Sequence, residues 1–281
     1  MFKSPQRSKY DVAWQELYDE MPGDNREYLS VHKERHWETF DTVARLVQHC
    51  RAPKILEVGT SPFIRLYRKL IPNASLTTID RPEGMLGMTA ETALEWGALR
   101  HYGVDLTTTP LGPDLGEPPI GLYDAVAFCE ILEHLPLSAT QLFSELFSLL
   151  EPDGYCYIMT PNSFALTRLR KVFNRENPQE AFQARGADKW AATHVREYSM
   201  SELFEAIDNA GGKVVRALYS NCWEDGYARD LLAETPALLS NLAIVAVPLY
   251  SPHAPDSTVS QVKLTFGALN ERELAIALPG R

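Results

Sequence analysis

Short apolar runs alternate with longer amphipathic segments through the middle of the chain. Runs that are bounded by Gly, Pro, Asn or Asp are typical of buried strands, and we expect strands at residues 55–58, 76–79, 101–106, 123–129 and 155–159. Helical spacing follows three of them, at residues 64–71, in the segment 81–99 and at 138–150. Right-handed crossovers between such strands produce a parallel sheet covered on both faces. The pattern predicts a doubly wound α/β domain.

The flanking segments follow the same two periodicities. We expect helices at residues 11–20 and about 25–50 before this domain, and after it helices at 164–173 and from Ser199 onward. Ser199 is the expected N-cap, with Glu202 as its capping-box partner. Further strands are predicted at 214–219 and 241–248, with an edge strand at 262–266. Turns are expected at 151–154 and at Gly211-Gly212, and a polar insertion of little regular structure at 174–189.

Composition narrows the classes of function. The formal net charge of −10 over 281 residues argues against a broad nucleic-acid-binding surface, which needs clustered Lys and Arg. No apolar run approaches the ~20 residues that span a bilayer, and residues 1–5 lack the apolar core of a secretion signal. The four cysteines are widely spaced, so neither a zinc site nor a disulfide framework is indicated: Cys50, Cys129, Cys156 and Cys222. These observations together predict a cytoplasmic protein.

Candidate chemistry gathers where the first two strands end. The first strand stops at Gly59, whose turn leads into a helix and leaves backbone N–H groups at the carboxyl edge of the sheet. The second strand ends at Asp80, 21 residues beyond Gly59 (80 − 59). This is close to the ~20-residue gap between glycine turn and ribose-binding acid in nucleotide-binding βαβ units. Asp80 is therefore a candidate ligand of ribose hydroxyls.

Four stretches, taken together and in order, resemble the class I S-adenosylmethionine-dependent methyltransferases, most closely the branch acting on small molecules, sugars and glycan or lipid precursors. They are Ile55 to Gly59, Thr78 to Asp80, Tyr123-Asp124 with Glu130 to Leu135, and Leu150 to Gly154 with Thr160 to Asn162; His194 to Tyr198 fits the same family. The resemblance implies a mostly parallel seven-stranded, Rossmann-like sheet whose last strand is antiparallel. It also implies S-adenosyl-L-methionine as the cofactor.

The resemblance assigns a role to each matching residue. Glu57, Gly59 and Thr60 would border the methionine part of the cofactor, Asp80 would bind the ribose hydroxyls, and Arg81 would flank the adenine. Asp105 and Leu106 would lie near the adenine amine and ring, and Cys129 and Glu130 would line the space below the sulfonium. A carboxylate-rich edge suits this cofactor because it carries a sulfonium and an ammonium. Asp105 could equally be only a local cap, and Glu130 only an acid at the core edge.

One departure from the family pattern concerns the glycine run. Only Gly59 is present, and Ser61 and Phe63 occupy the next two glycine positions with Pro62 between them. Glycine lets backbone approach a ligand closely. The replacement either narrows the pocket or redraws the turn around Pro62.

The resemblance implies three segments. Residues 1–52 would form an N-terminal helical cap, 53–248 the methyltransferase domain with an acceptor-side insertion at 164–198, and 249–281 a C-terminal extension. Within the cap, a polar stripe at helical spacing allows two interpretations, a solvated face or a lid with acceptor-binding groups: Tyr28, His32, Arg35 and His36.

His134 and His194 are the candidate catalytic residues, because an imidazole can remove the proton of an acceptor hydroxyl near neutral pH. Either could instead make only local hydrogen bonds, and positioning of the two reactants can suffice for methyl transfer. No metal-binding cluster is evident from the sequence. We expect O-methylation of a small-molecule, sugar or glycan-type acceptor. The alternatives are a methyltransferase-like scaffold without activity, and an NAD-dependent oxidoreductase, which fits poorly because the pyrophosphate cradle needs the missing glycines.

Overall fold

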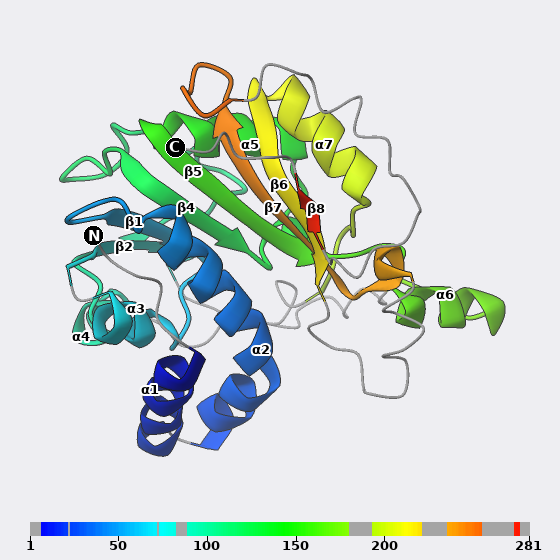
Figure 1. Ribbon diagram of the computed structural model, residues 1–281, viewed down its shortest axis with the longest axis horizontal. Helices are drawn as coiled ribbons and strands as arrows, with labels where there is room; N and C mark the ends of the chain where they lie inside the picture. The colour runs from blue at the N-terminus through cyan, green and yellow to red at the C-terminus, as the bar shows by residue number, and fades with distance from the viewer. Residues whose placement is uncertain are drawn as a thin grey trace. The chain divides into compact units, whose positions relative to one another are not determined.

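The computed structural model describes residues 7–21, 23–71, 73–82, 89–179, 193–220, 235–254 and 273–275. Figure 1 shows the helices and strands of the chain, which divides into two compact units. One comprises Met1–Cys129 and Ser148–Tyr157, and the other comprises Glu130–Phe147 and Ile158–Arg281. The expected 174–189 insertion lies partly, and the 262–266 strand and Cys222 entirely, outside the described residues. The domain limits expected from the sequence remain a prediction.

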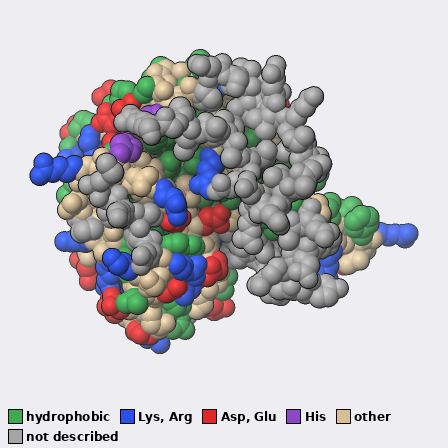
Figure 2. Space-filling view, viewed as in Figure 1, with side chains coloured by type: hydrophobic (Ala, Val, Ile, Leu, Met, Phe, Trp, Pro, Cys, Tyr) green, Lys and Arg blue, Asp and Glu red, His purple; other side chains and the backbone are tan. Residues whose placement is uncertain are grey.

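Two helices begin the first unit, as the apolar spacing predicts. They are α1 (Arg7–Glu20) and α2 (Gly23–Leu46). Helix α1 buries Tyr10, Ala13, Trp14 and Leu17 and contacts both α2 and α3 (Ile64–Leu70). Acidic and basic side chains alternate over this part of the surface (Figure 2), where ion pairs such as Lys69–Glu16 at 2.7 Å link α1 to α3.

Parallel strands form the sheet of the first unit, in the order β3-β2-β1-β4-β5. Their bounds are β1 (Lys54–Val58), β2 (Ser75–Asp80), β3 (Arg100–Gly103) and β4 (Tyr123–Cys129), with the short helix α4 (Ala90–Glu95) leading to β3. Val58 lies opposite Ile79 on one side and Phe128 on the other. Because neighbouring strands run in the same direction, their carboxyl ends reach one edge together.

Strand β5 (Leu150–Pro161) passes from the first unit into the second. The second unit continues the sheet in the order β5-β7-β6-β8. Its strands are β6 (Gly212–Ser220), β7 (Asn241–Pro248) and β8 (Glu273–Ala275), and β6 pairs antiparallel with both neighbours. Its helices are η1 (Leu132–His134), α5 (Ala139–Ser148), α6 (Leu166–Phe173), α7 (Met200–Asn209) and η4 (Pro236–Leu238).

The predicted α/β, Rossmann-like fold is confirmed, and β8 is added to the seven expected strands. The capping box that was expected to begin α7 is present, because Ser199 Oγ accepts from the N–H of Glu202 and the Glu202 carboxylate accepts from the N–H of Ser199. Gly211, with φ +76°, follows the end of the same helix. Among the described residues, no helix has the length and apolar character that crossing a membrane requires.

Several expected boundaries differ from the structure. Helix α1 begins at Arg7 instead of residue 11, and α2 ends at Leu46 instead of about residue 50. The third strand, expected at 101–106, ends at Gly103, and the Asp105 carbonyl accepts from the N–H groups of Thr108 and Thr109 in a turn. The segment 151–154 is part of β5 rather than a turn. A Cβ at Gly154 would lie 2.6 Å from the carbonyl oxygen of Tyr123. Glycine therefore serves here for close approach of backbone to backbone.

Candidate functional site

The turn after β1 is joined directly to the acid that ends β2. Gly59 has φ +84°, and its N–H donates to the carbonyl of Ile79 at 2.8 Å. The next N–H, that of Thr60, donates to Oδ2 of Asp80 at 3.0 Å. The left-handed conformation at Gly59 thus turns the Thr60 amide toward the neighbouring strand. The glycine and the acid that the sequence singles out belong to one structural feature.

Asp80 is a half-buried carboxylate held by two backbone amides. Oδ1 accepts from the N–H of Arg81 at 2.7 Å, and Oδ2 accepts from Thr60. Burial raises the pKa of Asp80, and the two N–H donors partly offset that rise because they stabilise the ionised form. A carboxylate oxygen has two lone pairs. Each oxygen of Asp80 can therefore accept a further hydroxyl donor without losing its backbone contact.

Glu57 is a second carboxyl at this edge, and its side chain is almost fully buried. The residue is 8% exposed, and the hydroxyl of Ser61 donates to Oε1 at 3.5 Å. Burial raises the pKa of Glu57 to about 8, the charge of Asp80 adds to the rise, and the Ser61 hydroxyl and Arg35 oppose it. A positively charged ligand would stabilise the ionised form of such a group.

The two residues in place of family glycines shape the turn instead of leaving it open. Neither Ser61 nor Phe63 is among the described residues with positive φ. Ser61 Oγ accepts from the N–H of Phe63 at 3.3 Å, and the Phe63 ring stacks on His36 with centroids 3.3 Å apart. The turn is thus redrawn around Pro62, and the aromatic side chain fills space between α2 and this loop.

The polar stripe of α2 is not a solvated face, so that interpretation is wrong. Arg35 is 7% exposed, and His36 lies against Phe63. Burial lowers the pKa of His36 well below its ordinary value. Arg35 is the charge on α2 that opposes the raised pKa of Glu57. Whether this stripe acts as a lid remains a prediction.

The other residues expected near the cofactor also lie in the first unit. Oδ1 of Asp105 accepts from the N–H and the hydroxyl of Thr107, and these bonds hold the pKa of Asp105 below its ordinary value. Asp105 therefore does cap its own turn, while Leu106 is buried. The Thr39 hydroxyl on α2 lies 3.8 Å from the sulfur of Cys129.

In the second unit, Glu130 has an unusual backbone conformation. Its φ is +57°, which is strained for a residue with a side chain. The strain is held by two contacts, since its N–H donates to the carbonyl of Met159 at 2.8 Å and its Oε1 accepts from Nδ2 of Asn241 at 2.8 Å. Strain maintained in this way is frequent at functional sites.

Glu133 is a buried carboxyl that the sequence analysis did not select. It is 1% exposed, and the hydroxyl of Thr160 donates to its Oε2 at 2.9 Å. Its Oε1 accepts no hydrogen bond from any residue that the structure describes, and Nε2 of His134 lies 3.7 Å away. Burial and the charge of Glu130 raise the pKa of Glu133 above its ordinary value. The adjacent Glu-His pair in the sequence was the available signal.

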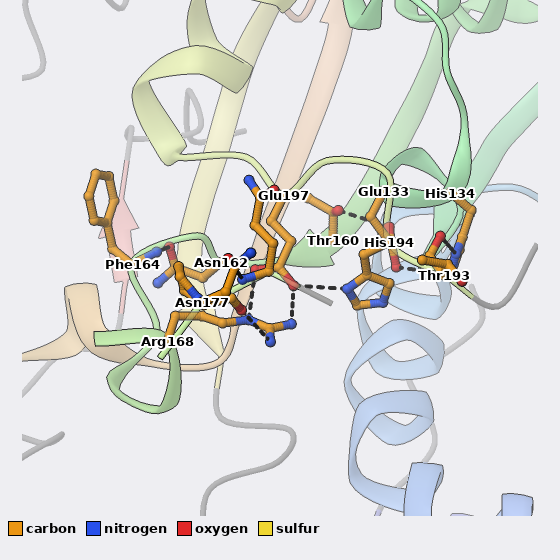
Figure 3. Close-up of polar contacts among 12 residues, drawn as sticks. Glu133, His134, Thr160, Asn162, Phe164, Arg168, Asn177, Thr193, His194 and Glu197 are labelled. Carbon is orange, nitrogen blue, oxygen red and sulfur yellow. Dashed lines mark hydrogen bonds and ion pairs between the residues drawn. The ribbon is translucent and has the colours of Figure 1, made fainter. Parts of the chain in front are cut away.

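His134 and His194 lie next to each other, with ring centroids 5.0 Å apart (Figure 3). Nδ1 of His134 is 3.2 Å from the carbonyl oxygen of Thr193, and Nδ1 of His194 is 2.8 Å from Oε1 of Glu197. Because a carbonyl and a carboxylate only accept, each Nδ1 carries the hydrogen in the neutral ring. In both rings the basic nitrogen is therefore Nε2.

Glu197 is the second residue of this group that the sequence did not reveal. Arg168 on α6 donates to both of its oxygens, with Nε at 2.9 Å from Oε2. Burial alone would raise the pKa of Glu197, but the hydrogen bonds from His194 and Arg168 outweigh it and hold the pKa below its ordinary value. A charged Glu197 orients the His194 ring. Arg168 lies within the helix that the sequence predicts at residues 164–173.

A groove lies beside this cluster in the same unit. Its volume is about 590 Å³, and it is lined by residues 135–140, by residues 195, 196 and 198, and by four residues along α7, Glu202, Glu205, Ala206 and Asn209. Its walls directly follow His134 and His194 in the chain. The volume is within the range of small-molecule sites.

Comparison with known proteins decides the family. A family model described as a methyltransferase domain matches residues 31–217. The chain belongs to this methyltransferase family. This membership decides against the oxidoreductase alternative. No curated protein matches the chain.

Solved structures similar to this methyltransferase share little sequence with it. Magnesium protoporphyrin IX methyltransferase from Synechocystis is 20% identical, with a TM-score of 0.49, and the match covers 86% of this chain and 94% of that one. An S-adenosylmethionine-dependent methyltransferase from Mesorhizobium loti is 15% identical, with a TM-score of 0.49 and coverage of 74% and 96%.

This methyltransferase uses S-adenosyl-L-methionine as its cofactor. One observation on the residues at the ends of β1 and β2 supports their fit to that molecule. Oγ1 of Thr60 is buried and has no hydrogen-bond partner among the described residues, so the loop holds a polar atom that a ligand group can satisfy. Two nearby carboxyls, Glu57 and Asp80, match a ligand with hydroxyls and positive charge.

Proposed function

We propose that this methyltransferase transfers the methyl group to a hydroxyl oxygen of a small-molecule, sugar or glycan/lipid-precursor acceptor. The observation that carries this proposal is the pair of imidazoles, His134 and His194, each with its basic Nε2 set by a hydrogen bond at Nδ1. Oxygen acceptors differ from thiolates and neutral amines because a hydroxyl must lose a proton to become a good nucleophile.

Cofactor binding is assigned to the residues for which the resemblance implies it. Asp80 would accept the two ribose hydroxyls, while Glu57, Gly59 and Thr60 would bind the methionine part. Arg81 would flank the adenine, and Asp105 and Leu106 would lie near the adenine amine and ring. Cys129 and Glu130 would lie below the sulfonium. S-adenosyl-L-methionine supplies a methyl group on positively charged sulfur. The protein's part is to hold this charge near carboxylates and to orient the ribose.

Proton removal is assigned to the second unit. Nε2 of His134 or of His194 would accept the proton of the acceptor hydroxyl, whose oxygen would take the methyl group that the cofactor supplies. Glu197 stabilises the imidazolium of His194, because a negative charge lies 2.8 Å from its Nδ1.

Acceptor selection is assigned to the least regular parts of the chain. The groove of about 590 Å³ has room for a ring-sized acceptor. The N-terminal cap of residues 1–52 and the insertion of residues 164–198 would add specificity, and residues 249–281 form an extension to the domain of residues 53–248. The proposal includes a cytoplasmic location, which the free thiols of Cys50 and Cys156 suit. Cell fractionation tests that location.

Calorimetric titration with S-adenosylhomocysteine tests the cofactor assignment. The intact protein should bind it, and Asp80→Ala should weaken binding by about 10- to 100-fold, the value of hydrogen bonds to a charged group. Asp114→Ala, in the loop before β4, is the matched control and should bind as the wild type does. Absence of binding by the intact protein would remove the proposal.

Turnover tests the choice of oxygen. Methyl transfer from labelled cofactor should be detected with polyhydroxylated acceptors. His134→Ala should reduce the rate of transfer by ~10²-fold or more and should leave binding of S-adenosylhomocysteine unchanged. Retention of the cofactor without transfer to any acceptor in the panel would favour the inactive-scaffold alternative. Transfer only to amine or thiol acceptors would refute the choice of oxygen.

A further inference from the structure

Three ligand-type groups converge in the second unit from two distant stretches of the chain. Glu133, His134 and His194 each offer one ligand atom, and these atoms all lie within 4.8 Å of one another. The Glu133 carbonyl accepts from the N–H groups of Val195 and Arg196, at 2.7 and 3.2 Å. These backbone bonds fix the 193–196 segment against η1. The cluster is thus built by the fold and not by flexible surface chains.

We propose that Glu133, His134 and His194 together bind a divalent transition-metal cation. The inference concerns this chain's own side chains, and metal binding itself does not depend on the proposed O-methylation. Two imidazoles and one carboxylate on one side of a cation leave further coordination positions open for water or an acceptor oxygen.

The hydrogen bonds at the outer nitrogens of the two histidines have the arrangement that a metal site requires. Metal-binding histidines donate their other ring N–H to a carbonyl or carboxylate, which fixes the ring and leaves the opposite nitrogen basic. His134 does so with Thr193, and His194 does so with Glu197, which Arg168 holds in turn (Figure 3). The same tautomer, with Nε2 as the ligand atom, is therefore selected in both rings.

The state of Glu133 is an independent observation that points to a ligand. One oxygen accepts from the Thr160 hydroxyl, while Oε1 is buried and accepts no hydrogen bond from the described residues. A buried carboxylate oxygen without a donor is costly, and a cation would compensate it. Nε2 of His134, at 3.7 Å, lies on that side of the carboxylate. A cation with ligand bonds of about 2.0–2.2 Å brings its ligand atoms to roughly 3 Å from each other, which side-chain rotation can achieve.

The donor set also selects the class of cation. Mg²⁺ and Ca²⁺ prefer oxygen ligands only, whereas mixed imidazole and carboxylate sites suit Mn²⁺, Fe²⁺, Co²⁺ and Zn²⁺. The consequence for the proposed function is specific. A cation at this site would lower the pKa of an acceptor hydroxyl that it binds, and the proton would leave to solvent. In the metal-loaded chain the cation would thus activate the hydroxyl, and the imidazoles would act as the base only in the metal-free chain, since one lone pair cannot do both.

Binding of Mn²⁺ to the chelator-treated full chain tests the inference. Electron paramagnetic resonance reports the loss of the free-ion signal, and calorimetry with Zn²⁺ gives an independent stoichiometry. We expect one site per chain and loss of affinity by at least 100-fold in His194→Ala and in Glu133→Gln. Glu197→Gln should lose 10- to 100-fold, as for other groups that hydrogen-bond to a metal-binding histidine. His253→Ala, a histidine of the same unit outside the cluster, is the matched control and should bind as the wild type does.

Binding of S-adenosylhomocysteine is the folding control for each variant. A wild-type chain that retains this ligand but binds neither Mn²⁺ nor Zn²⁺ below millimolar concentration overturns the metal site and leaves the imidazole base in place. Metal binding that persists in the double variant His134→Ala/His194→Ala would also overturn it. Metal binding that depends on these residues, in a chain that methylates no hydroxyl, would support the site and refute the proposed function.

Discussion

Glu57→Gln should stabilise the protein at alkaline pH, although it removes a polar group that we assign to the cofactor. The substitution exchanges a carboxyl for an amide of the same shape. In the folded chain the side chain is 8% exposed and receives one long hydrogen bond from Ser61, at 3.5 Å. Ionisation of the carboxyl in this environment is unfavourable because burial removes its hydration.

The magnitude follows from the pKa of Glu57, which burial raises from an ordinary value of 4.5 to about 8. Below pH 4.5 both folded and unfolded chains hold the proton. Between pH 4.5 and 8 the unfolded chain has released it and the folded chain has not, so the free energy of unfolding falls as pH rises. At about 1.4 kcal/mol per pH unit, the loss of unfolding free energy amounts to about 5 kcal/mol above pH 8. Glutamine does not titrate and escapes this cost.

Urea denaturation of both proteins at intervals from pH 5 to 9 measures the effect. The difference in unfolding free energy between Glu57→Gln and wild type should be small at pH 5 and should grow by several kcal/mol by pH 8.5, in favour of the variant. Other titrating groups cancel in this difference. Glu205→Gln, an exposed glutamate of α7, is the control and should give a flat difference. A flat profile for Glu57→Gln would show that the carboxyl ionises normally when folded, and the reasoning would be refuted.

Three further substitutions test the packing that positions the site. Gly154→Ala should lower the free energy of unfolding by about 1–3 kcal/mol in urea denaturation, because its Cβ would lie 2.6 Å from the Tyr123 carbonyl. The control Gly112→Ala, whose Cβ meets nothing within 4 Å, should leave the free energy of unfolding unchanged. Equal losses in the two variants would contradict the steric explanation. Ser199→Ala should cost about 1 kcal/mol by removing the capping box, and an unchanged denaturation midpoint would argue against it. Phe63→Gly, which restores the family glycine, should lower the free energy of unfolding by about 3–5 kcal/mol. A variant that keeps its stability and binds the cofactor more tightly would show that Phe63 narrows the pocket instead.

The sequence alone determined the framework of the fold and one edge of the site. Strand β4 and strand β7 have the expected bounds, since a short apolar run with clear breakers at each end has few alternatives. Gly59 and Asp80 could be paired in advance because parallel neighbours bring their ends together, and the Thr60–Asp80 bond shows that they do. Local chemistry was also sufficient for the capping box at Ser199.

Tertiary structure decided what distant or buried residues do. His134 and His194 are 60 residues apart (194 − 134), and no periodicity relates them; they meet because the Glu133 carbonyl pairs with the amides of Val195 and Arg196. The burial of Glu133, and of Arg35 in an apparently solvated stripe, depends on what packs against each helix. A sequence records which side chains can ionise or bind, but the loss of hydration that makes a buried carboxyl reactive exists only once the chain has folded around it.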